Sequence, residues 1–413
     1  MPPLTCPPHR RHAALLLSTL LGVSPVLVAC SSDDGVARGP INLKTGVPVG
    51  AVLALSGNAN VYGQDQRLGL NLALASLNGG SGINGTPLRL SIEDSGSDDP
   101  GANAAMTLQI NRGMLAVIGP TLSQQAFAAD PIAERRGVPV VAPSNTATGI
   151  PQIGHFISRV SAQSAVIAPL SIAKALRLNP NIRRAAVFFA QDDAYSTAET
   201  AVFQKALAAK GLKPVTVQRT NLADSDFQSQ VSATLALKPD LIVVSLQGVD
   251  GGNLVRQLRE LGYKGTIVVG NGMNTPNIYP ICQKYCDGLL IAQAYSPELA
   301  TPANRAFVKA FTANQSRSGK GPMIPPQLTA QAYTALQVVG EALQRLDKRQ
   351  PLRTLTVASA RKALMDEILG GTYQTPLGEI RFTAEGEVIQ KDFFVAQVRM
   401  NPDGRSGRFA LLP

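Results

Sequence analysis

The fold class is indicated by one stretch of the sequence, MLAVIGPTLSQQAFAADPIAERRGVPVVAPSNTA, residues 114–147. It reads as a short apolar strand over 114–119, a helix over 123–136 and a second apolar strand over 138–143. Short apolar strands separated by a helix are typical of a βαβ unit, in which both strands lie parallel in one sheet. The stretch therefore predicts an α/β fold built on a parallel sheet.

The same alternation continues on both sides of this stretch. Strands are predicted at 49–55, 88–94, 185–190, 215–219, 241–246 and 266–270, and helices at 64–78, 100–113, 194–210, 226–237 and 252–261. The mixed segment 155–165 separates two runs of βαβ units, and each run has about the right size for one doubly wound domain. We therefore expect two doubly wound parallel-sheet lobes, with a first crossing between them near 155–165.

The C-terminal part of the chain has too few strands for a domain of its own. After the apolar segment 288–295, helices are expected near 302–316, 327–347 and 355–369, and strands at 379–382 and 392–398. We expect these pieces to complete the two lobes, which are then joined by a multi-strand hinge. This division assigns residues 47–160 and 294–376 to lobe 1, and residues 161–293 and 377–413 to lobe 2.

The N-terminus has the features of an export signal. Two arginines precede the apolar run AALLLSTLLGVSPVLVA, which is short for a membrane span and is followed by polar sequence. The run ends in LVAC (27–30), which resembles the lipobox of bacterial lipoprotein precursors. The resemblance implies a signal peptide over 1–29, a lipid on Cys30 and a tether over 30–46, with the protein membrane-anchored in the periplasm or at the cell surface. An ordinary secretory signal with a chance cysteine is the alternative.

The charge balance does not indicate a nucleic-acid partner. The chain has 38 Lys and Arg residues against 28 Asp and Glu residues, and residues 1–29 contain two arginines and no acids, which leaves 36 against 28 and a net charge of +8. The basic residues are scattered along the chain, which favours a solvated basic surface. Tryptophan is absent and aromatic residues make up 5% of the chain, so a platform for base stacking is disfavoured.

Two cysteines remain after Cys30. Cys282 and Cys286 are four residues apart, and on a helix this spacing brings their Cα atoms within disulfide range, about 6 Å. In an exported protein we expect a local disulfide, with a reduced pair as the second reading. A metal site ranks third, since two ligands do not close a zinc shell.

Ser123 follows the strand 114–119 directly, and four roles are open to it: nucleophile, phosphate cradle, carboxylate clamp or helix cap. His155 is the one histidine after residue 29, and no G-x-S-x-G elbow surrounds the serine. The P-loop and H-E-x-x-H patterns do not occur. We therefore expect no catalytic residues, no metal and no cofactor, and a binding protein in place of an enzyme.

A second hydroxyl residue follows the next strand. Thr146 comes just after the strand 138–143, as Ser123 comes after the strand before it. In open α/β sheets ligands lie beyond the carboxyl ends of the strands, near the N-termini of helices. The two hydroxyls therefore suit a carboxylate clamp, and the pattern is equally compatible with two helix caps.

Five segments carry a family resemblance and cover nearly all of the chain after residue 46. They include LSGNANVYGQ at the start of 55–100, VIGPTLS and VVAPSNTA within 114–147, FFAQDDAYSTA within 185–198, PDLIVVSLQG within 224–248, and TPLGEIRFTAEGE, residues 375–387. Their order resembles the type I periplasmic solute-binding proteins, in the leucine/isoleucine/valine-binding branch of ABC transporter receptors. Such proteins have two α/β lobes that close around a small ligand.

The resemblance also implies site residues. Ser123 and Thr146 stand where the family holds the ligand carboxylate, and the adjacent backbone contributions fall at Leu122 and Ser144. The aromatic residues that line the two lobes correspond to two tyrosines, Tyr62 and Tyr195.

The second lobe departs from the family pattern at the remaining two site positions. Gln247 occupies a position that is often aromatic. Asn271 follows the strand after which the family has an acidic residue for the ligand ammonium. A buried ammonium needs a compensating charge or full hydrogen bonding, so a carboxylate without the amine, an amide or an aromatic acid becomes a candidate ligand.

These observations predict a monomeric, lipid-anchored receptor that captures a small amino-acid-like, carboxylate or amide solute between two lobes. It would present the closed form to the permease subunits of an ABC importer. A ligand-sensing protein of the same fold with a signalling partner is the alternative, and an enzyme is the third reading.

Overall fold

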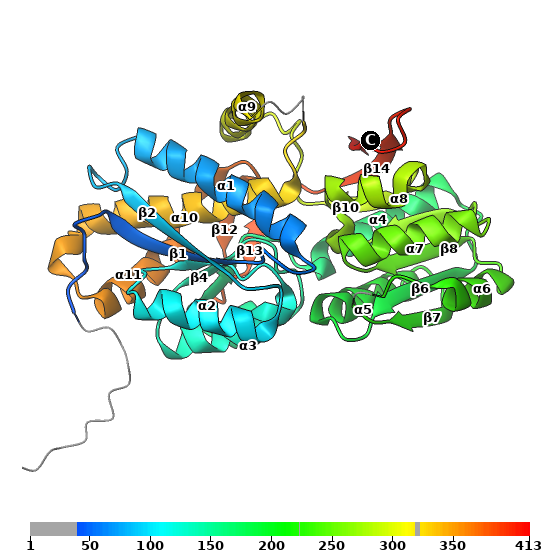
Figure 1. Ribbon diagram of the computed structural model, residues 1–413, viewed down its shortest axis with the longest axis horizontal. Coiled ribbons are helices and arrows are strands. Elements are labelled where there is room, and N and C mark those ends of the chain that lie inside the picture. Colours follow the sequence, from blue (N-terminus) through cyan, green and yellow to red (C-terminus); the bar gives the residue numbers. More distant parts are fainter. Residues whose placement is uncertain (1–38, 223, 319–322) are drawn as a thin grey trace, which may run out of the picture. The chain divides into compact units, whose positions relative to one another are not determined.

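Figure 1 shows the computed structural model, which describes residues 39–222, 224–318 and 323–413. The expected signal peptide, Cys30 and residues 31–38 of the expected tether lie outside the described residues. The described chain forms an α/β fold with a five-stranded sheet, a seven-stranded sheet and a small three-stranded sheet. The two large sheets confirm the expected pair of doubly wound lobes.

The five-stranded sheet is entirely parallel and has the order β2-β1-β3-β4-β5. Its strands are β1 (Val47–Leu53), β2 (Leu88–Asp94), β3 (Val117–Ile118), β4 (Val140–Ala142) and β5 (Ile157–Arg159). The strands alternate their side chains between two hydrophobic clusters, so that Val49 and Leu53 contribute to one and Val52 to the other. We call this sheet, with the helices on its two faces, the first lobe.

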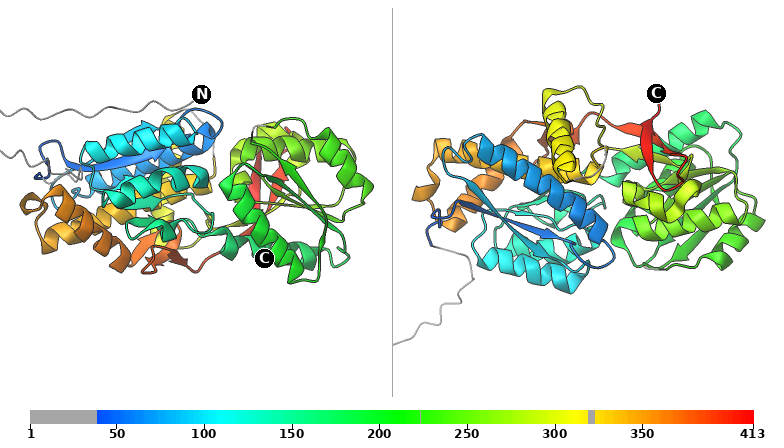
Figure 2. Two further views of the ribbon diagram at one scale, coloured as in Figure 1. Left: turned by 90° about the horizontal axis from the view of Figure 1, so that it is seen from below. Right: turned by 45° about the horizontal axis from the view of Figure 1, so that its top comes forward.

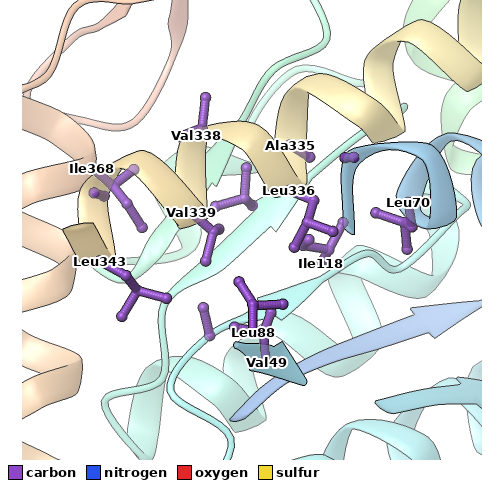
Figure 3. Packing of buried hydrophobic residues seen from close by; sticks show 14 of the residues in the cluster. Val49, Leu70, Leu88, Ile118, Ala335, Leu336, Val338, Val339, Leu343 and Ile368 are labelled. Carbon is purple, nitrogen blue, oxygen red and sulfur yellow. The ribbon is translucent and has the colours of Figure 1, made fainter. Parts of the chain in front are cut away.

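Helices cover both faces of the first sheet. The helices of the first lobe are α1 (Asn60–Gly79), α2 (Asp99–Asn111), α3 (Ser123–Arg135), α9 (Pro302–Arg317), α10 (Gln327–Arg349) and α11 (Val357–Gly370). In Figure 1, α1 and α10 lie on one face of the sheet, and α2 and α3 on the other. Figure 3 shows Leu336, Val339 and Leu343 of α10 packing towards Val49 and Leu88 of the strands.

The seven-stranded sheet belongs to the second lobe and begins with the same strand order. The parallel strands β6 (Ala185–Ala190), β7 (Pro214–Thr220), β8 (Leu241–Ser245), β9 (Thr266–Val269) and β10 (Leu290–Gln293) are ordered β7-β6-β8-β9-β10. β14 (Phe394–Met400) and β15 (Gly407–Leu411) extend the β10 edge as antiparallel strands. The C-terminal pieces therefore do complete the first two domains, as expected.

Helices also enclose the second sheet, as the left view of Figure 2 shows. They are α4 (Ser164–Leu178), α5 (Ala194–Ala208), α6 (Gln228–Ala236), α7 (Gly248–Glu260) and the short α8 (Tyr279–Cys282). α4 was not predicted from the sequence, where only the mixed segment 155–165 separates the two runs of βαβ units.

The small sheet corrects the expected lobe boundary. It consists of β11 (Tyr373–Thr375), β12 (Gly378–Phe382) and β13 (Val388–Gln390). Leu377, Ile380 and Phe382 are buried in the core of the first lobe. Residues 377–390 therefore belong to the first lobe and not to the second, and the last crossing of the chain lies between β13 and β14.

The expected tether also needs a correction in its described part. Pro40 forms an antiparallel bridge with Thr356, the N–H of Val357 donates to the carbonyl of Gly39 (3.0 Å), and Ile41 is buried. These contacts attach the segment to the start of α11. Residues 39–46 are thus part of the first lobe and not a free linker.

Cys282 and Cys286 form a disulfide in the second lobe, with their Cα atoms 5.3 Å apart. The two cysteines do not lie on one continuous helix, which the prediction from their spacing had assumed. α8 ends at Cys282, and Gln283, the first residue of the following 3-10 turn Gln283–Cys286, has a positive φ of 51°.

The helices of the described residues include none long and apolar enough to cross a membrane.

Candidate functional site

All eight residues that the sequence singled out line one cavity of about 40 Å³. The first lobe contributes Tyr62, Leu122, Ser123, Ser144 and Thr146, and the second lobe contributes Tyr195, Gln247 and Asn271. Three further lining residues, Thr121, Gly272 and Leu328, were not singled out.

The topology explains why these residues meet. In each lobe the strand order reverses between the first and third strands, β1 and β3 or β6 and β8. Loops at such a point diverge to opposite faces of the sheet and leave a crevice beyond the carboxyl ends of the strands. The lining residues of both lobes follow the ends of strands at this crevice, except Leu328, which belongs to α10.

Ser123 does not cap its own helix. Leu122 is the N-cap residue of α3 and makes no side-chain cap bond, and Ser123 is the first helical residue. The Ser123 Oγ instead accepts hydrogen bonds from the backbone N–H groups of Thr146 (3.2 Å) and Ala147 (3.3 Å). Both lone pairs of the Ser123 oxygen serve these two donors, so its O–H hydrogen is free to donate to a ligand.

Thr146 provides the second hydroxyl. Its side chain is 2% exposed, and its Oγ1 has no hydrogen-bond partner among the described residues. Buried hydroxyls of this kind are uncommon in folded proteins. Together with the N-terminus of α3, Ser123 and Thr146 form a set of neutral donors suited to an anionic or carbonyl oxygen. The residues that line the cavity include neither an acidic nor a basic side chain.

Ser144 has a supporting role. Its hydroxyl donates to the carbonyl of Thr121 (2.6 Å) and accepts from Gln66 Nε2 (2.7 Å). Gln66 Oε1 in turn accepts from the Thr121 hydroxyl (2.6 Å), whose oxygen accepts from the N–H of Ala54 (3.0 Å). This network joins the loops after β1, β3 and β4, and it leaves the Ser144 backbone, not its hydroxyl, for a ligand. Sequence reasoning missed Gln66, since a polar residue on a helix gives no signal of its burial.

A buried carboxylate lies behind the wall of the second lobe. Tyr195 Oη donates to Glu199 Oε2 (2.6 Å) and accepts from the N–H of Gly272 (2.6 Å). Glu199 also accepts from the N–H of Asn271 (2.9 Å) and from Ser245 Oγ (2.8 Å). Burial raises the pKa of Glu199, and burial with the nearby Glu199 carboxyl raises that of Tyr195. Glu199 does not line the cavity, so it positions Tyr195 and the 271–272 backbone.

The two residues at which the sequence departs from the resemblance, Gln247 and Asn271, both form hydrogen bonds within the protein. Gln247 Nε2 donates to Asp193 Oδ2 (3.0 Å), and Asn271 Oδ1 accepts from Gln327 Nε2 (3.0 Å). Asn271 therefore offers no charge to a ligand ammonium, and its amide oxygen already accepts one hydrogen bond. The structure thus agrees with the sequence in leaving this end of the cavity without an acidic partner.

Tyr62 connects the two lobes through its hydroxyl. It donates to the carbonyl of Gly272 (2.6 Å) and accepts from the N–H of Gly248. A side chain at Gly248 would place its Cβ 3.0 Å from the Tyr62 oxygen, so the position favours glycine. Burial is the main cause that raises the pKa of Tyr62, which keeps its hydroxyl protonated. A second link joins Gln124 Oε1 to the N–H of Ala194 (3.3 Å).

A larger cavity of about 430 Å³ adjoins the first. Tyr62, Leu122 and Gln247 line both cavities, so they form the partition between them. The larger cavity is lined by carboxylates of Asp193, Asp224 and Asp250 and by no Lys, Arg or His side chain. Its size lies within the range of about 300–1,000 Å³ that is common for ligand sites.

The chain is similar to known proteins along most of its length. The family model described as "Periplasmic binding protein" matches residues 46–405. The leucine-, isoleucine-, valine-, threonine- and alanine-binding protein of Pseudomonas aeruginosa is 25% identical over 345 residues, 83% of this chain and 87% of that protein. The Leu/Ile/Val-binding protein of Escherichia coli is 24% identical over 303 residues, 73% of this chain and 80% of its own length.

Two solved structures show the same fold. A leucine binding protein, LivK, from Thermotoga maritima has a TM-score of 0.76 at 26% identity and covers 89% of this chain and 98% of its own. A solute binding protein of an ABC transporter from R. palustris, in complex with benzoate, has a TM-score of 0.75 at 20% identity, with 89% and 96% covered.

Proposed function

The chain belongs to the periplasmic binding protein family, and from this premise we propose that it is the receptor of an ABC importer for a small solute with a carboxylate or amide group. The solute binds between the lobes and its closed complex is presented to the permease. The lipid on Cys30, the location at a membrane outside the cytoplasm and the monomeric state remain part of this proposal.

The pair of hydroxyls at Ser123 and Thr146 carries the proposal. The Ser123 hydroxyl has a hydrogen that is free to donate, and the Thr146 hydroxyl has no partner in the described part of the chain. Both residues line the same uncharged cavity. Such a site binds a carboxylate or carbonyl oxygen through neutral donors and a helix N-terminus. Two relatives named above bind leucine and benzoate. Both ligands carry a carboxylate, and only leucine carries an amine.

The walls of the cavity favour a solute without an α-ammonium group. An ammonium buried beside Asn271 would have no carboxylate to face, since Glu199 lies behind Tyr195 and its oxygens already accept hydrogen bonds. Burial of an unpaired charge costs several kcal/mol, on the order of the binding energy of the whole solute. The body of a larger solute would pass Tyr62 and Gln247 into the adjoining cavity, where the carboxylates lie.

The proposal is tested by a thermal-shift screen with branched-chain amino acids, aromatic acids, their amides and longer ω-amino acids. A solute that binds only the folded protein raises its melting temperature. We expect the largest shifts from carboxylates or amides without an α-amine.

The solute found in the screen then tests the clamp by calorimetry. Ser123→Ala and Thr146→Ala should each weaken binding by about 1–3 kcal/mol, the usual cost of a lost buried partner. Ser158→Ala is the matched control, because its buried hydroxyl donates to the Val140 carbonyl (2.9 Å) and does not line the cavity. Unchanged affinity in both clamp variants, or an equal loss in the control, would contradict the clamp.

A further inference from the structure

A third cavity, of about 490 Å³, lies where chain segments of both lobes meet. We call it the hinge cavity. Its lining comes from the segment after β9, the segment after β10, the residues before α10 and the β14–β15 hairpin, and includes Asn274, Tyr279, Tyr295, Gln327, Arg405 and Arg408. The segments after β10 and before α10 are among those that connect the lobes. This cavity shares no lining residue with the one at Ser123 and Thr146, so the two cavities are distinct.

Three of its lining side chains have buried polar groups without partners. Tyr279 is 4% exposed, Tyr295 is 3% exposed and Asn274 is 3% exposed. The two phenolic oxygens and the Asn274 Nδ2 have no hydrogen-bond partner among the described residues, while Asn274 Oδ1 accepts from Gln293 Nε2 (2.7 Å). All three groups can donate, and three buried donors without a described partner on residues that line one cavity are unusual.

The charge of the hinge cavity is positive. Arg405 and Arg408 line it, and the described residues of its lining include no Asp or Glu. Asp403, on the same hairpin, accepts from the backbone N–H groups of Arg405 and Ser406 (2.9 Å each). Guanidinium groups pair well with carboxylates, often through two parallel hydrogen bonds.

Another part of the wall is apolar. Pro297, Met323, Ile324 and Pro325 line it together with Phe409, whose ring lies 5.6 Å from that of Tyr279. Met323 and Ile324 are among the exposed large hydrophobic residues of the described chain. A ligand here therefore meets donors and cations on one side and aliphatic or aromatic surface on the other.

From these contacts we infer that the hinge cavity is a second binding site, for a monocarboxylate with an aliphatic or aromatic body. The carboxylate accepts from the Tyr279 and Tyr295 hydroxyls and faces the arginines, and the body packs on Pro297, Met323 and Phe409. The inference goes beyond the proposed capture of a solute at the clamp and needs no solute there.

Gln327 connects the two sites. It lines the hinge cavity, its Oε1 accepts from the N–H of Ala294 (2.8 Å), and its Nε2 donates to Asn271 Oδ1 (3.0 Å), which lines the first cavity. A ligand that holds the connecting segments in this arrangement thereby favours the lobe contacts around the solute. By linkage, each ligand then changes the affinity of the other by the same factor.

The test uses octanoate and calorimetry on the purified protein. We expect octanoate to bind, and to bind equally well to the Ser123→Ala, Thr146→Ala double variant, which separates the hinge cavity from the clamp. Tyr279→Phe, Tyr295→Phe and Arg408→Gln should each weaken octanoate binding about tenfold, the usual effect of one lost bond to a charged group. Arg408 is exposed, so its variant remains informative if a tyrosine variant folds poorly.

The control is Tyr263→Phe, whose hydroxyl donates to the Thr266 carbonyl (3.1 Å) outside this cavity. No octanoate binding, binding that the double variant abolishes, or binding that is insensitive to all three hinge variants would each overturn the inference. The first of these outcomes would mean that water satisfies the unpaired donors. None of them bears on solute capture at the clamp, which is measured separately.

Discussion

The charge of the Asp193 side chain at a given pH depends on its burial in the folded protein. It caps α5 by accepting from the N–H groups of Tyr195 and Ser196 (3.3 Å each), and it is 2% exposed. Burial raises the pKa of Asp193 to about 6, and the hydrogen bonds from Gln247 and the α5 backbone only partly oppose this. The wall of the larger cavity therefore gains negative charge as the pH rises towards neutral.

Asp193→Asn should change the pH dependence of stability. In the folded protein the carboxyl titrates near 6, and in the unfolded chain near 3.8. Between these values the unfolded chain releases its proton first, so the wild type loses stability as the pH rises, and the loss is complete above about pH 6. Relative to the Asn variant, the wild-type free energy of unfolding should fall by about 2–3 kcal/mol from pH 4 to 7.

Urea denaturation at each pH unit measures this difference. The Asn side chain retains an oxygen that can cap α5, so the cap itself is a small term. A difference between the two proteins that stays constant over this pH range would show that Asp193 titrates normally.

Among the elements, α1 and α10 pack closely against each other at two glycines. A Cβ at Gly69 of α1 would lie 2.2 Å from the Thr329 carbonyl oxygen of α10. At Gly340 of α10 the nearest atoms are the methyl groups of Leu77, at 2.7 and 2.8 Å. The first neighbour is backbone and the second is the end of a flexible side chain. This contact positions the start of α10, which holds Gln327 and Leu328.

Gly69→Ala should destabilise the protein by about 1–3 kcal/mol or more, since the helices must move apart to admit the methyl group. Gly340→Ala is the matched control in the same interface. Leu77 can shift there, and the gain in helix propensity of up to about 1 kcal/mol offsets part of the cost. Urea denaturation followed by circular dichroism compares the two, and equal stabilities would show that the α1–α10 spacing is adaptable.

For the whole molecule, the relation between the lobes depends on protein groups as well as on a solute. Tyr62, Gln124 and Gln327 each form a hydrogen bond to the second lobe beside the small cavity. The resemblance in the sequence implied that Tyr62 lines the ligand, yet its hydroxyl bonds to Gly248 and Gly272. These bonds stabilise the arrangement in which all eight site residues meet.

Tyr62→Phe should weaken this arrangement while it keeps the ring. Each of the two lost bonds is worth about 0.5–1.5 kcal/mol, so the balance should shift by about 1–3 kcal/mol, roughly five- to a hundredfold, towards open forms. Small-angle scattering of the solute-free variant should give a larger radius of gyration than the wild type. Solute affinity should fall in proportion, because fewer molecules are in the binding-competent form. Tyr263→Phe is the control. Scattering curves that coincide for all three proteins would show that the Tyr62 hydroxyl does not hold the lobes together.

From the sequence alone come the alternation of strands and helices, the two-lobed α/β class and, from their places after strands, Ser123 and Thr146. Apolar periodicity carries this information, because each strand or helix forms from residues close together in the chain. The other six predicted residues that line the small cavity were implied by the family resemblance. The same local reasoning placed the lobe boundary too early, at 376/377, since the burial of Ile380 and Phe382 depends on partners far away in the sequence.

The hydrogen bonds of the site residues depend on contacts between distant parts of the chain. Tyr62 and Gly272 are 210 positions apart, and no local pattern indicates that the tyrosine hydroxyl bonds to that carbonyl. The same holds for the burial of Glu199 behind Tyr195, for the support that Gln66 gives to Ser144, and for the unpaired donors of the hinge cavity. Hydrogen-bond partners and cavities are properties of packed surfaces, and these exist only once distant segments are brought together.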